Sequence, residues 1–269
     1  MSSAGWVDAH YLACQPEYEA MIRSVGLQAG WHVLDAGSGT GQFTSVIAEL
    51  IGVRGRISAI DVAPENIAIV QAQAASGVFR CSVDARRADI RALPFADQTF
   101  DAVWSANVVQ YLNQRELAEA LAEFRRVLKP GGVLAVKDGD ITALQIFPIP
   151  PTVLWRLLDA WARRGDQQIQ GLLGSLDLLR HVRQAGFASV SRSVTFMERT
   201  APLRPPESQF VGGLVEFLCG LALTLDLSPA DIEFWRRVGT PQSDHFILKK
   251  SDLYLREAAI LVVGLKQRE

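Results

Sequence analysis

Short apolar runs alternate with helix-like segments from Trp31 to Asp140, and this alternation restricts the chain to few folds. The runs are continuously apolar, which is typical of parallel strands buried on both faces. The segments between them have helical spacing, as in successive βα units. The runs occupy residues 32–36, 56–61, 101–105 and 133–137, and the helical segments occupy residues 43–51, 63–75 and 116–128. We therefore predict an α/β fold with a doubly wound, mostly parallel sheet.

Further elements are predicted outside this core. Residues 16–25 carry apolar and aromatic side chains at helical spacing and predict a leading helix. Ser175 is a candidate N-cap for a helix that ends at Gly186, and residues 188–197 are typical of a strand. Residues 254–265 predict a last strand, which we expect to run antiparallel. We predict seven strands in total.

Two helical insertions interrupt the later part of the chain. Residues 141–170 begin with a proline-rich turn, and residues 201–250 contain two helices, the second with Ser228 as N-cap and a proline after it. Their aromatic side chains have two open interpretations: they line an apolar acceptor pocket under a lid, or they dock the helices onto a core. These side chains are Trp155, Trp161, Phe210, Phe217 and Trp235.

The composition is that of an ordinary globular protein. The formal net charge of −2 over 269 residues provides no basic surface of the kind that nucleic-acid binding requires. We predict one domain over residues 1–269, with a leading helical segment at 1–30 and a cofactor-binding core at 31–140. The oligomeric state that we expect is a monomer or a homodimer.

Cysteine usage and the apolar segments bear on the cellular compartment. Cys14, Cys81 and Cys219 are widely separated, which argues against a disulfide framework and against a zinc cluster. The first residues do not form a signal peptide, and no apolar window is long enough to span a membrane. We therefore expect a cytoplasmic protein without a bound metal.

A glycine-rich turn follows the first predicted strand, at Leu34-Asp35-Ala36-Gly37-Ser38-Gly39-Thr40-Gly41. Glycines allow a sharp turn and let a ligand approach the backbone closely. Asp61 ends the second strand, 24 residues after Gly37, where a carboxylate can accept both hydroxyls of a ribose. These two features alone do not separate an adenosyl cofactor from NAD.

Two further aspartates favour a cofactor without phosphate. Asp89 stands where it can accept from the exocyclic amine of adenine, with Ile90 and Val62 beside the faces of the ring. Asp35 precedes the first glycine, and an anion there disfavours a pyrophosphate. S-adenosyl-L-methionine has no phosphate and carries a sulfonium and an ammonium, which suit these negative charges. An alternative for Asp35 is that it only orders the turn.

On these motifs the chain resembles the class I methyltransferases, most of all the group with the ubiquinone/menaquinone C-methylases and small-molecule O-methylases. The resemblance extends from Trp31 to about Asp138 and includes Ala88-Asp89-Ile90, Leu93-Pro94-Phe95 and Lys129-Pro130-Gly131-Gly132. It implies the cofactor S-adenosyl-L-methionine, with the methionine part bound by the turn, the ribose by Asp61 and the adenine by Asp89 and Ile90. With those argued from the residues above, the predicted cofactor-binding residues are Asp35, Gly37, Ser38, Gly39, Gly41, Asp61, Val62, Asp89, Ile90, Ser105, Ala106 and Asn107.

A general base is needed only if the acceptor must lose a proton. Asp138 and Asp140 follow the carboxyl end of a strand, where ligands of open α/β sheets bind. The complete set of candidate catalytic residues is His10, Tyr11, Asp138, Asp140, His181 and His245. For each histidine, the alternative is an ordinary surface or helix position.

Three specialised classes are disfavoured by the segment after the fourth strand. Ser105-Ala106-Asn107 lacks the acidic residue of metal-dependent catechol methylases and the Pro-Pro-aromatic motif of nucleic-acid amino-methylases. The paired-glutamate loop of protein arginine methylases is also absent. We therefore expect methylation of a small, largely apolar metabolite, as in secondary metabolism, with O-methylation slightly favoured over C- or N-methylation. Two alternatives are a non-methylating enzyme with pericyclic or elimination chemistry, and a catalytically silent adenosyl-binding subunit.

Overall fold

The computed structural model describes residues 4–268, which form two compact units. The sheet unit comprises Pro16–Gly139, Gly171–Thr195 and the chain from Ala259 onward. The helical unit comprises the chain up to Gln15, Asp140–Gln170 and Phe196–Ala258. The single domain over residues 1–269 stays a prediction.

The strands form one seven-stranded sheet in the order β3-β2-β1-β4-β5-β7-β6 within the described residues. Strands β1 to β5 pair in parallel, as when Val33 of β1 lies beside Ile57 of β2 and Ala102 of β4. The start of β5 exchanges backbone hydrogen bonds with the end of β7, at Gly131, Gly132 and Lys266, so β7 is antiparallel. The bounds are β1 His32–Ala36, β2 Arg56–Asp61, β3 Ser82–Arg87, β4 Phe100–Ala106, β5 Leu128–Phe147, β6 Ala188–Thr200 and β7 Tyr254–Leu265.

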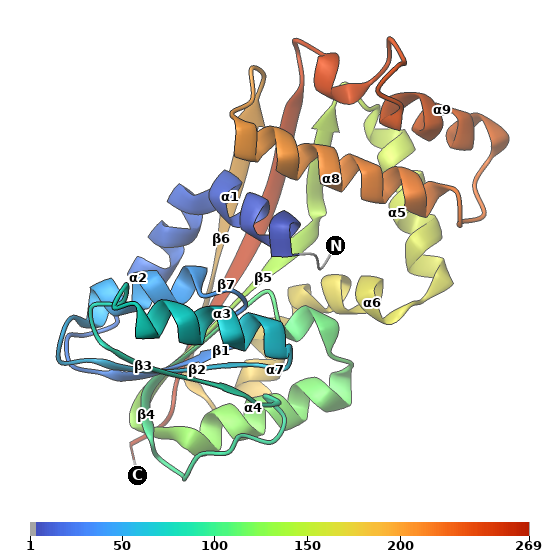
Figure 1. Cartoon of the computed structure of the whole chain (residues 1–269). Helices are drawn as coiled ribbons and strands as arrows, with labels where there is room; N and C mark the ends of the chain where they lie inside the picture. The colour runs from blue at the N-terminus through green and yellow to red at the C-terminus, as the bar shows by residue number, and fades with distance from the viewer. Residues whose placement is uncertain (1–3, 269) are drawn as a thin grey trace. The chain divides into compact units, whose positions relative to one another are not determined.

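Helices cover both faces of the sheet in the sheet unit, which confirms the doubly wound α/β prediction. Figure 1 shows α3 (Pro64–Ala75) and α4 (Gln114–Val127) on opposite faces, with α2 (Gln42–Ile51) on the side of α3. The short helix α7 (Leu178–Gln184) buries Leu178 and Val182 in the same apolar cluster as α4.

Helix α4 shows how the sequence specifies these positions. The Asn113 side chain accepts from the Glu116 N–H, and the Glu116 side chain accepts from the Asn113 N–H. These two hydrogen bonds form a capping box at the first turn. The side chains at one face are apolar and buried against the sheet, and Phe124 is fully buried. Arg125 and Arg126 occupy the last turn, where positive charge suits the helix dipole.

The helical unit contains α5 (Pro151–Arg164), α8 (Pro205–Ala222) and α9 (Pro229–Gly239), whereas α6 (Gln167–Gly174) spans the boundary between the units. Ser228 caps α9 by accepting from the Asp231 N–H, as predicted. Arg156 of α5 donates two hydrogen bonds to the buried Asp231 carboxylate, with N···O distances of 2.9 and 2.5 Å. This bidentate pair ties α5 to α9.

The aromatic side chains of the insertions divide between the two interpretations. Trp161, Phe210 and Trp235 are at most 1% exposed, so they pack in the core of the helical unit. Phe217 packs edge-on against Trp161, with ring centroids 5.6 Å apart. Trp155 of α5 is 55% exposed, so its side chain is accessible to solvent. The lid role of the insertions stays a prediction.

Some element boundaries differ from the predicted ones. Helix α1 (Ala4–Ser24) begins well before Pro16, because buried Ala9, Ala13 and Cys14 extend the apolar face toward the N-terminus. Strand β5 continues to Phe147, ten residues beyond its predicted end, and so takes up the start of the predicted insertion. These differences arise where the apolar pattern uses small or alternating residues.

The predicted cap at Ser175 is wrong. Ser175 lies in the short 3₁₀ helix η2 (Ser175–Asp177), and α7 begins only at Leu178. The Ser175 hydroxyl lies within hydrogen-bonding distance of the Gly139 and Leu172 carbonyls instead. Since its hydroxyl is engaged there, it does not cap the following helix.

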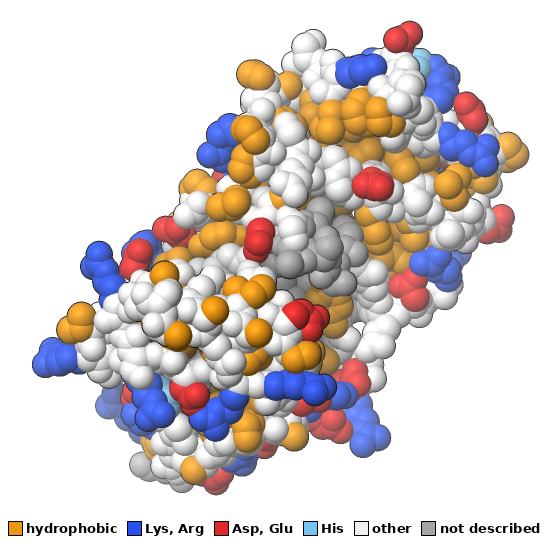
Figure 2. Space-filling view, in the orientation of Figure 1, with side chains coloured by type: hydrophobic (Ala, Val, Ile, Leu, Met, Phe, Trp, Pro, Cys, Tyr) orange, Lys and Arg blue, Asp and Glu red, His pale blue; other side chains and the backbone are white. Residues whose placement is uncertain are grey.

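The surface carries both signs of charge. Figure 2 shows basic and acidic side chains interspersed on the visible face, in agreement with the small net charge. Among residues 4–268, no helix combines the length and the apolar character that a membrane crossing needs.

Phe124→Ala tests the position of the core. We expect a loss of about 3–5 kcal/mol in the free energy of unfolding, because the truncation leaves a cavity at a fully buried site. Val53→Ala, at a position that is 80% exposed, is the control and should stay within about 0.5 kcal/mol. Urea denaturation measures both, and equal effects would contradict the assignment of α4 to the core.

Candidate active site

The turn between β1 and α2 depends on glycine at defined positions. Gly37, Gly39 and Gly41 have φ values of +82°, +53° and +93°, in the left-handed region that other residues rarely adopt. A Cβ on Gly37 would lie 2.2 Å from a methyl carbon of Val108. A Cβ on Gly39 would meet no heavy atom closer than Gln42 Oε1, at 3.8 Å. The turn is therefore tightly packed at Gly37 and open at Gly39.

Hydrogen bonds attach this turn to the end of β2. The N–H groups of Gly37 and Ser38 both donate to the Ile60 carbonyl, at 2.8 and 2.9 Å. The Gly39 N–H donates to Asp61 Oδ2 at 2.9 Å, and the Ala63 N–H donates to Asp61 Oδ1 at 2.9 Å. Two of the predicted site elements, the turn and Asp61, are thus directly joined.

Asp35 lies buried at the base of the turn. Its Oδ2 accepts a hydrogen bond from Thr44 Oγ1 of α2, at 2.5 Å. Burial, with a smaller effect of the Asp61 charge, raises the pKa of Asp35 to about 7, and the Thr44 hydrogen bond opposes this shift. An unpaired anion is costly at this depth, so a cation bound nearby would favour the ionised form.

A negatively charged group is favoured where the turn leads into α2. Helix α2 starts after Gly41, and no side chain caps its first N–H groups. Free N–H groups and the helix dipole favour a carboxylate at such a position. The Ser38 hydroxyl is buried there and has no hydrogen-bond partner among the described residues. The turn thus presents a site for an anion and, at Asp35, a site for a cation.

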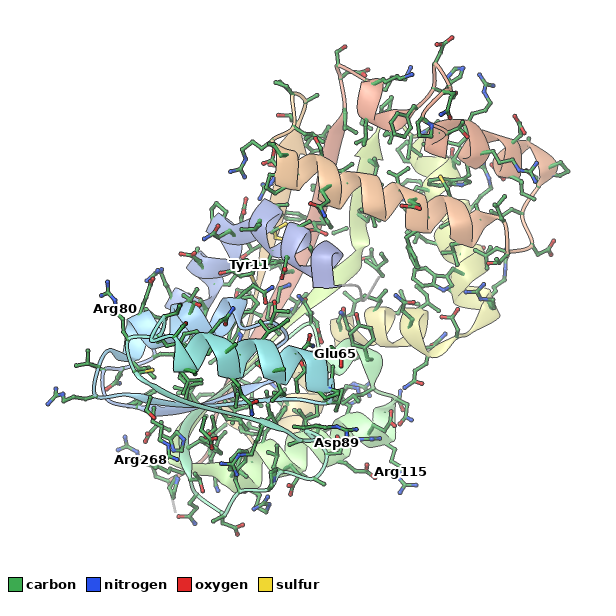
Figure 3. All side chains as sticks on the ribbon, in the orientation of Figure 1. Tyr11, Glu65, Arg80, Asp89, Arg115 and Arg268 are labelled. Atoms are coloured by element: carbon green, nitrogen blue, oxygen red, sulfur yellow. The ribbon has the colours of Figure 1, made fainter. Side chains whose placement is uncertain are left out.

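The residues predicted to bind adenosine differ in how much of their side chains is available to a ligand. Each Asp61 oxygen accepts one N–H and retains a further lone pair for a hydroxyl. Val62 is 61% exposed, which leaves an apolar surface next to Asp61, and Ile90 is buried. Asp89, labelled in Figure 3, accepts hydrogen bonds from Arg91, and this guanidinium lowers the pKa of Asp89. Asp89 is therefore ionised and able to accept, although it shares its oxygens with Arg91.

A residue with a positive φ follows strand β4. Asn107 has a φ of +58°, and its N–H donates to the Lys137 carbonyl at 2.8 Å. Its side-chain Oδ1 accepts from Lys137 Nζ at 2.6 Å. Ser105 and Ala106 precede it in β4, and the fully buried Ser105 hydroxyl has no hydrogen-bond partner within residues 4–268. Strain and orphaned polar atoms of this kind concentrate at ligand sites.

Lys137 is a buried cation that sequence reasoning missed. It is 1% exposed, and its Nζ lies 3.8 Å from the centroid of the Tyr18 ring, in addition to its bond to Asn107. The one sequence signal was a lysine in the apolar run of β5, where charge is rare. Lys137 fixes the side chain of Asn107 at the end of β4.

Asp138 follows Lys137 and is fully buried. Neither carboxylate oxygen makes a hydrogen bond of normal geometry within the described residues. Burial raises the pKa of Asp138 to about 7, and the Lys137 charge and the backbone of Gln110 offset part of the effect. A carboxyl group with such a pKa exchanges a proton readily near neutral pH.

The other candidate catalytic residues lie in different places. His10, Tyr11 (labelled in Figure 3) and His245 belong to the helical unit, whereas Asp138 and His181 belong to the sheet unit. The His10 Nε2 lies 3.0 Å from Glu257 Oε1, and the exposed His245 contacts Arg237. Burial on α7 lowers the pKa of His181.

Asp140, the last candidate, is engaged locally. Its Oδ1 accepts from the Thr142 N–H at 3.0 Å and from the Thr142 hydroxyl at 2.6 Å. Among these candidates, Asp138 combines deep burial with unpaired carboxylate oxygens.

The chain matches a family model described as a methyltransferase domain over residues 33–132. It is 37% identical over 124 residues to the O-methyltransferase resE of Aspergillus sclerotiorum, which covers 45% of this chain and 46% of the relative. It is 34% identical over 117 residues to the ubiquinone/menaquinone biosynthesis C-methyltransferase UbiE of Teredinibacter turnerae, which covers 44% of this chain and 46% of the relative. Over this segment the chain is similar to the class I S-adenosylmethionine-dependent methyltransferases.

The solved structures extend the likeness in fold beyond this segment. A methyltransferase from Bacillus halodurans, described in its own name as putative, superposes with a TM-score of 0.59 at 16% identity. The superposition covers 92% of this chain and 97% of that chain, and it shows a shared fold. In sequence, the match spans less than half of the length of the curated relatives above.

The geometry of the candidate site fits S-adenosylmethionine. The open, amide-lined turn with the orphaned Ser38 hydroxyl suits the carboxylate of an amino acid, and Asp35 suits its ammonium. Asp61 has lone pairs to offer to the ribose hydroxyls, and Val62 provides an exposed apolar contact. No basic side chain stands in the turn itself, residues 37–41, to receive a phosphate.

Asp35→Asn tests the raised pKa of Asp35 without any ligand. A folded-state pKa of about 7, above the ordinary 3.8, means that the folded protein holds this proton more tightly than the unfolded chain. The loss of stability that ionisation of Asp35 causes therefore grows as the pH rises from about 4 to about 7, and it is constant above pH 7. We expect the stability of Asp35→Asn, relative to wild type, to increase over that range and then to level off.

Chemical denaturation at a series of pH values measures this difference. Asp159→Asn, an exposed position on α5, is the control for the same chemical change. A stability difference for Asp35→Asn that does not vary between pH 4 and pH 7 would contradict the raised pKa of Asp35.

Proposed function

We propose that this methyltransferase transfers a methyl group from S-adenosylmethionine to a hydroxyl oxygen of a small, largely apolar metabolite. The observation that carries the proposal is the buried, unpaired carboxyl of Asp138 in the same unit as the cofactor turn. The cofactor, when bound, supplies a methyl group on a positively charged sulfur.

The first task of the protein is to hold the cofactor. The turn at residues 37–41 and the start of α2 hold the amino-acid carboxylate, and Asp35 holds the ammonium. Asp61 binds the ribose, and Asp89 with Ile90 binds the adenine. Fixing these groups on a rigid sheet lowers the entropic cost of an in-line transfer.

The second task is to remove a proton from the acceptor. Asp138 is our candidate general base because its pKa of about 7 lets it be ionised at neutral pH and still accept a proton. A phenolic hydroxyl needs such a base, whereas a neutral amine does not. A base also serves a carbon acid, and the curated relatives include O- and C-methyltransferases, so Asp138 favours oxygen or carbon over nitrogen and the test below separates the two.

One aromatic side chain, Tyr111, supports an aromatic acceptor at Asp138. The 3₁₀ helix η1 (Val109–Tyr111) carries Tyr111, which is half exposed. Burial of its hydroxyl and the nearby charge of Asp138 both raise the pKa of Tyr111. An aromatic ring this close to the base offers a stacking surface to an aromatic acceptor. A cytoplasmic location and a monomeric or homodimeric state stay predictions.

Incubation with cofactor labelled in its methyl group tests the proposed function directly. A panel of small phenols, carbon acids and amines serves as acceptors, and mass spectrometry locates the label. We expect the label on oxygen. Label on carbon or nitrogen would contradict the acceptor atom, and cofactor-dependent conversion without label would indicate non-methylating chemistry. Neither label nor conversion with any acceptor would favour a silent adenosyl-binding subunit.

Asp138→Asn tests the general base. We expect kcat to fall by about 10²–10⁴-fold while the affinity for the cofactor is retained, because only proton removal is lost. In wild type, activity should rise with pH to a plateau above about pH 7, because Asp138 acts when ionised, and the variant should lack this rise. Steady-state kinetics over pH measures both.

Asp140→Asn is the matched control for this change. Asp140 is two residues away, but its carboxylate is bonded to Thr142, so we expect kcat to stay close to wild type. An Asp138→Asn enzyme with normal kcat, or equal losses in both variants, would overturn the role of Asp138.

A further inference from the structure

Three side chains that can bind a metal converge in the helical unit. His10 and Cys14 are one turn apart on α1 and therefore lie on the same face of the helix. Glu257 comes from β7, more than 240 residues later in the chain. His10 Nε2 lies 3.0 Å from Glu257 Oε1, and Cys14 Sγ lies 3.1 Å from the same oxygen. The ligand atoms of all three residues lie within 4.8 Å of one another.

The surroundings hold these groups in place. Cys14 is 1% exposed, and the side chains of His10 and Glu257 are each 17% exposed. The His10 ring stacks on Phe210 of α8, with centroids 4.3 Å apart and an interplanar angle of 5°. Stacking fixes the direction in which Nε2 points, and this direction is toward Glu257.

A buried cation, Arg199, contacts the backbone of α1 and is paired with a carboxylate of its own. Arg199 of β6 donates from Nε to the Ala13 carbonyl at 2.7 Å, and the same Nε lies 3.4 Å from Glu207 Oε1. Burial opposes ionisation of Glu207, but Arg204 and the Arg199 charge bring the net shift of its pKa downward. The positive charge of Arg199 is thus shared with Glu207.

We propose that His10, Cys14 and Glu257 bind a divalent transition metal, with Zn²⁺ as the preferred ion. Imidazole nitrogen, thiolate sulfur and carboxylate oxygen are the three ligand types of protein zinc sites. Ligand bonds of about 2.0–2.3 Å place tetrahedral ligand atoms somewhat farther apart than the present 3.0 and 3.1 Å contacts. Small side-chain shifts would bring these atoms to the separations that the ion needs.

The mixed donor set also selects among metals. Mg²⁺ and Ca²⁺ prefer oxygen ligands, so a thiolate and an imidazole disfavour them. Three protein ligands leave one tetrahedral position for water or another small ligand. Such an arrangement is that of an open zinc site rather than a closed structural one.

Metal binding at this site exchanges protons for the ion. The Cys14 thiol loses its proton to solvent and binds as thiolate, and any proton shared between His10 and Glu257 is also released. No electron is transferred. Affinity therefore increases with pH, as expected for ligands that must be deprotonated. The proposal does not depend on the methyl-transfer activity, and it departs from our sequence-based expectation of no metal.

Co²⁺ is the probe for this site, because its absorption reports both thiolate ligation and tetrahedral geometry. The full-length protein is treated with a chelator and titrated with Co²⁺, and Zn²⁺ is then added in competition. We expect one Co²⁺ per chain with a thiolate-to-metal charge-transfer band, and displacement of that Co²⁺ by Zn²⁺. Zn²⁺ should also raise the melting temperature of the metal-free protein.

Cys14→Ser should abolish the charge-transfer band and weaken binding on the order of 10–100-fold or more. His10→Gln and Glu257→Gln should weaken binding similarly but keep the band, because Cys14 remains. Cys81→Ser, a cysteine in the sheet unit, is the matched control and should behave like wild type. Melting curves without metal show whether each variant folds. If Cys14→Ser does not fold, His10→Gln and Glu257→Gln still test the site.

Two outcomes would overturn the proposal. One is wild-type protein that shows no thiolate–Co²⁺ band, which would leave the three residues as a hydrogen-bonded cluster only. The other is a folded set of site variants that bind Co²⁺ as tightly as wild type, which would place the metal elsewhere.

Discussion

The turn after β1 is held against the end of β2, and the site depends on this attachment. Parallel pairing of β1 with β2 brings Ile60 and Asp61 beside the glycines, so that the Ile60 carbonyl accepts two N–H groups of the turn and Asp61 accepts the Gly39 N–H. Sheet register therefore places the turn, the uncapped start of α2 and the Asp61 carboxylate next to one another. Burial raises the pKa values of Asp35 and Asp138 to about 7, and perturbed groups of this kind cluster at functional sites.

The sequence predicted the fold best where burial imposes a regular pattern. The apolar runs of β1, β2 and β4 are buried on both faces, and their predicted bounds lie close to the observed ones. Strand β3 was expected in the total of seven but not located, because Ser82–Arg87 is a polar edge strand with one buried residue, Ala85. Ser175 was misassigned as a cap because a serine hydroxyl serves a 3₁₀ turn equally well. Local propensity does not distinguish such cases.

The candidate site also contains residues that the sequence predicted and contacts that it did not. Residues adjacent in sequence to the strand ends, such as Asp35 and Asp61, were predictable because parallel strands place their carboxyl ends at one edge. Their contact partners were not predicted. Thr44 lies beside Asp35 from the following helix, whereas Lys137 against Tyr18 and Glu257 beside His10 are contacts between distant segments. Packing alone reveals these contacts, and the proposed metal site depends entirely on one of them.

Calorimetric titration with S-adenosylhomocysteine, S-adenosylmethionine and NADH tests the central claim most directly. Wild type should bind the two adenosyl compounds and not NADH. Asp61→Ala should lose about 1–3 kcal/mol of binding free energy through the ribose hydrogen bonds, with Asp159→Ala unchanged. Tighter binding of NADH by wild type, or an Asp61→Ala protein that folds and binds the adenosyl compounds with undiminished affinity, would contradict the account.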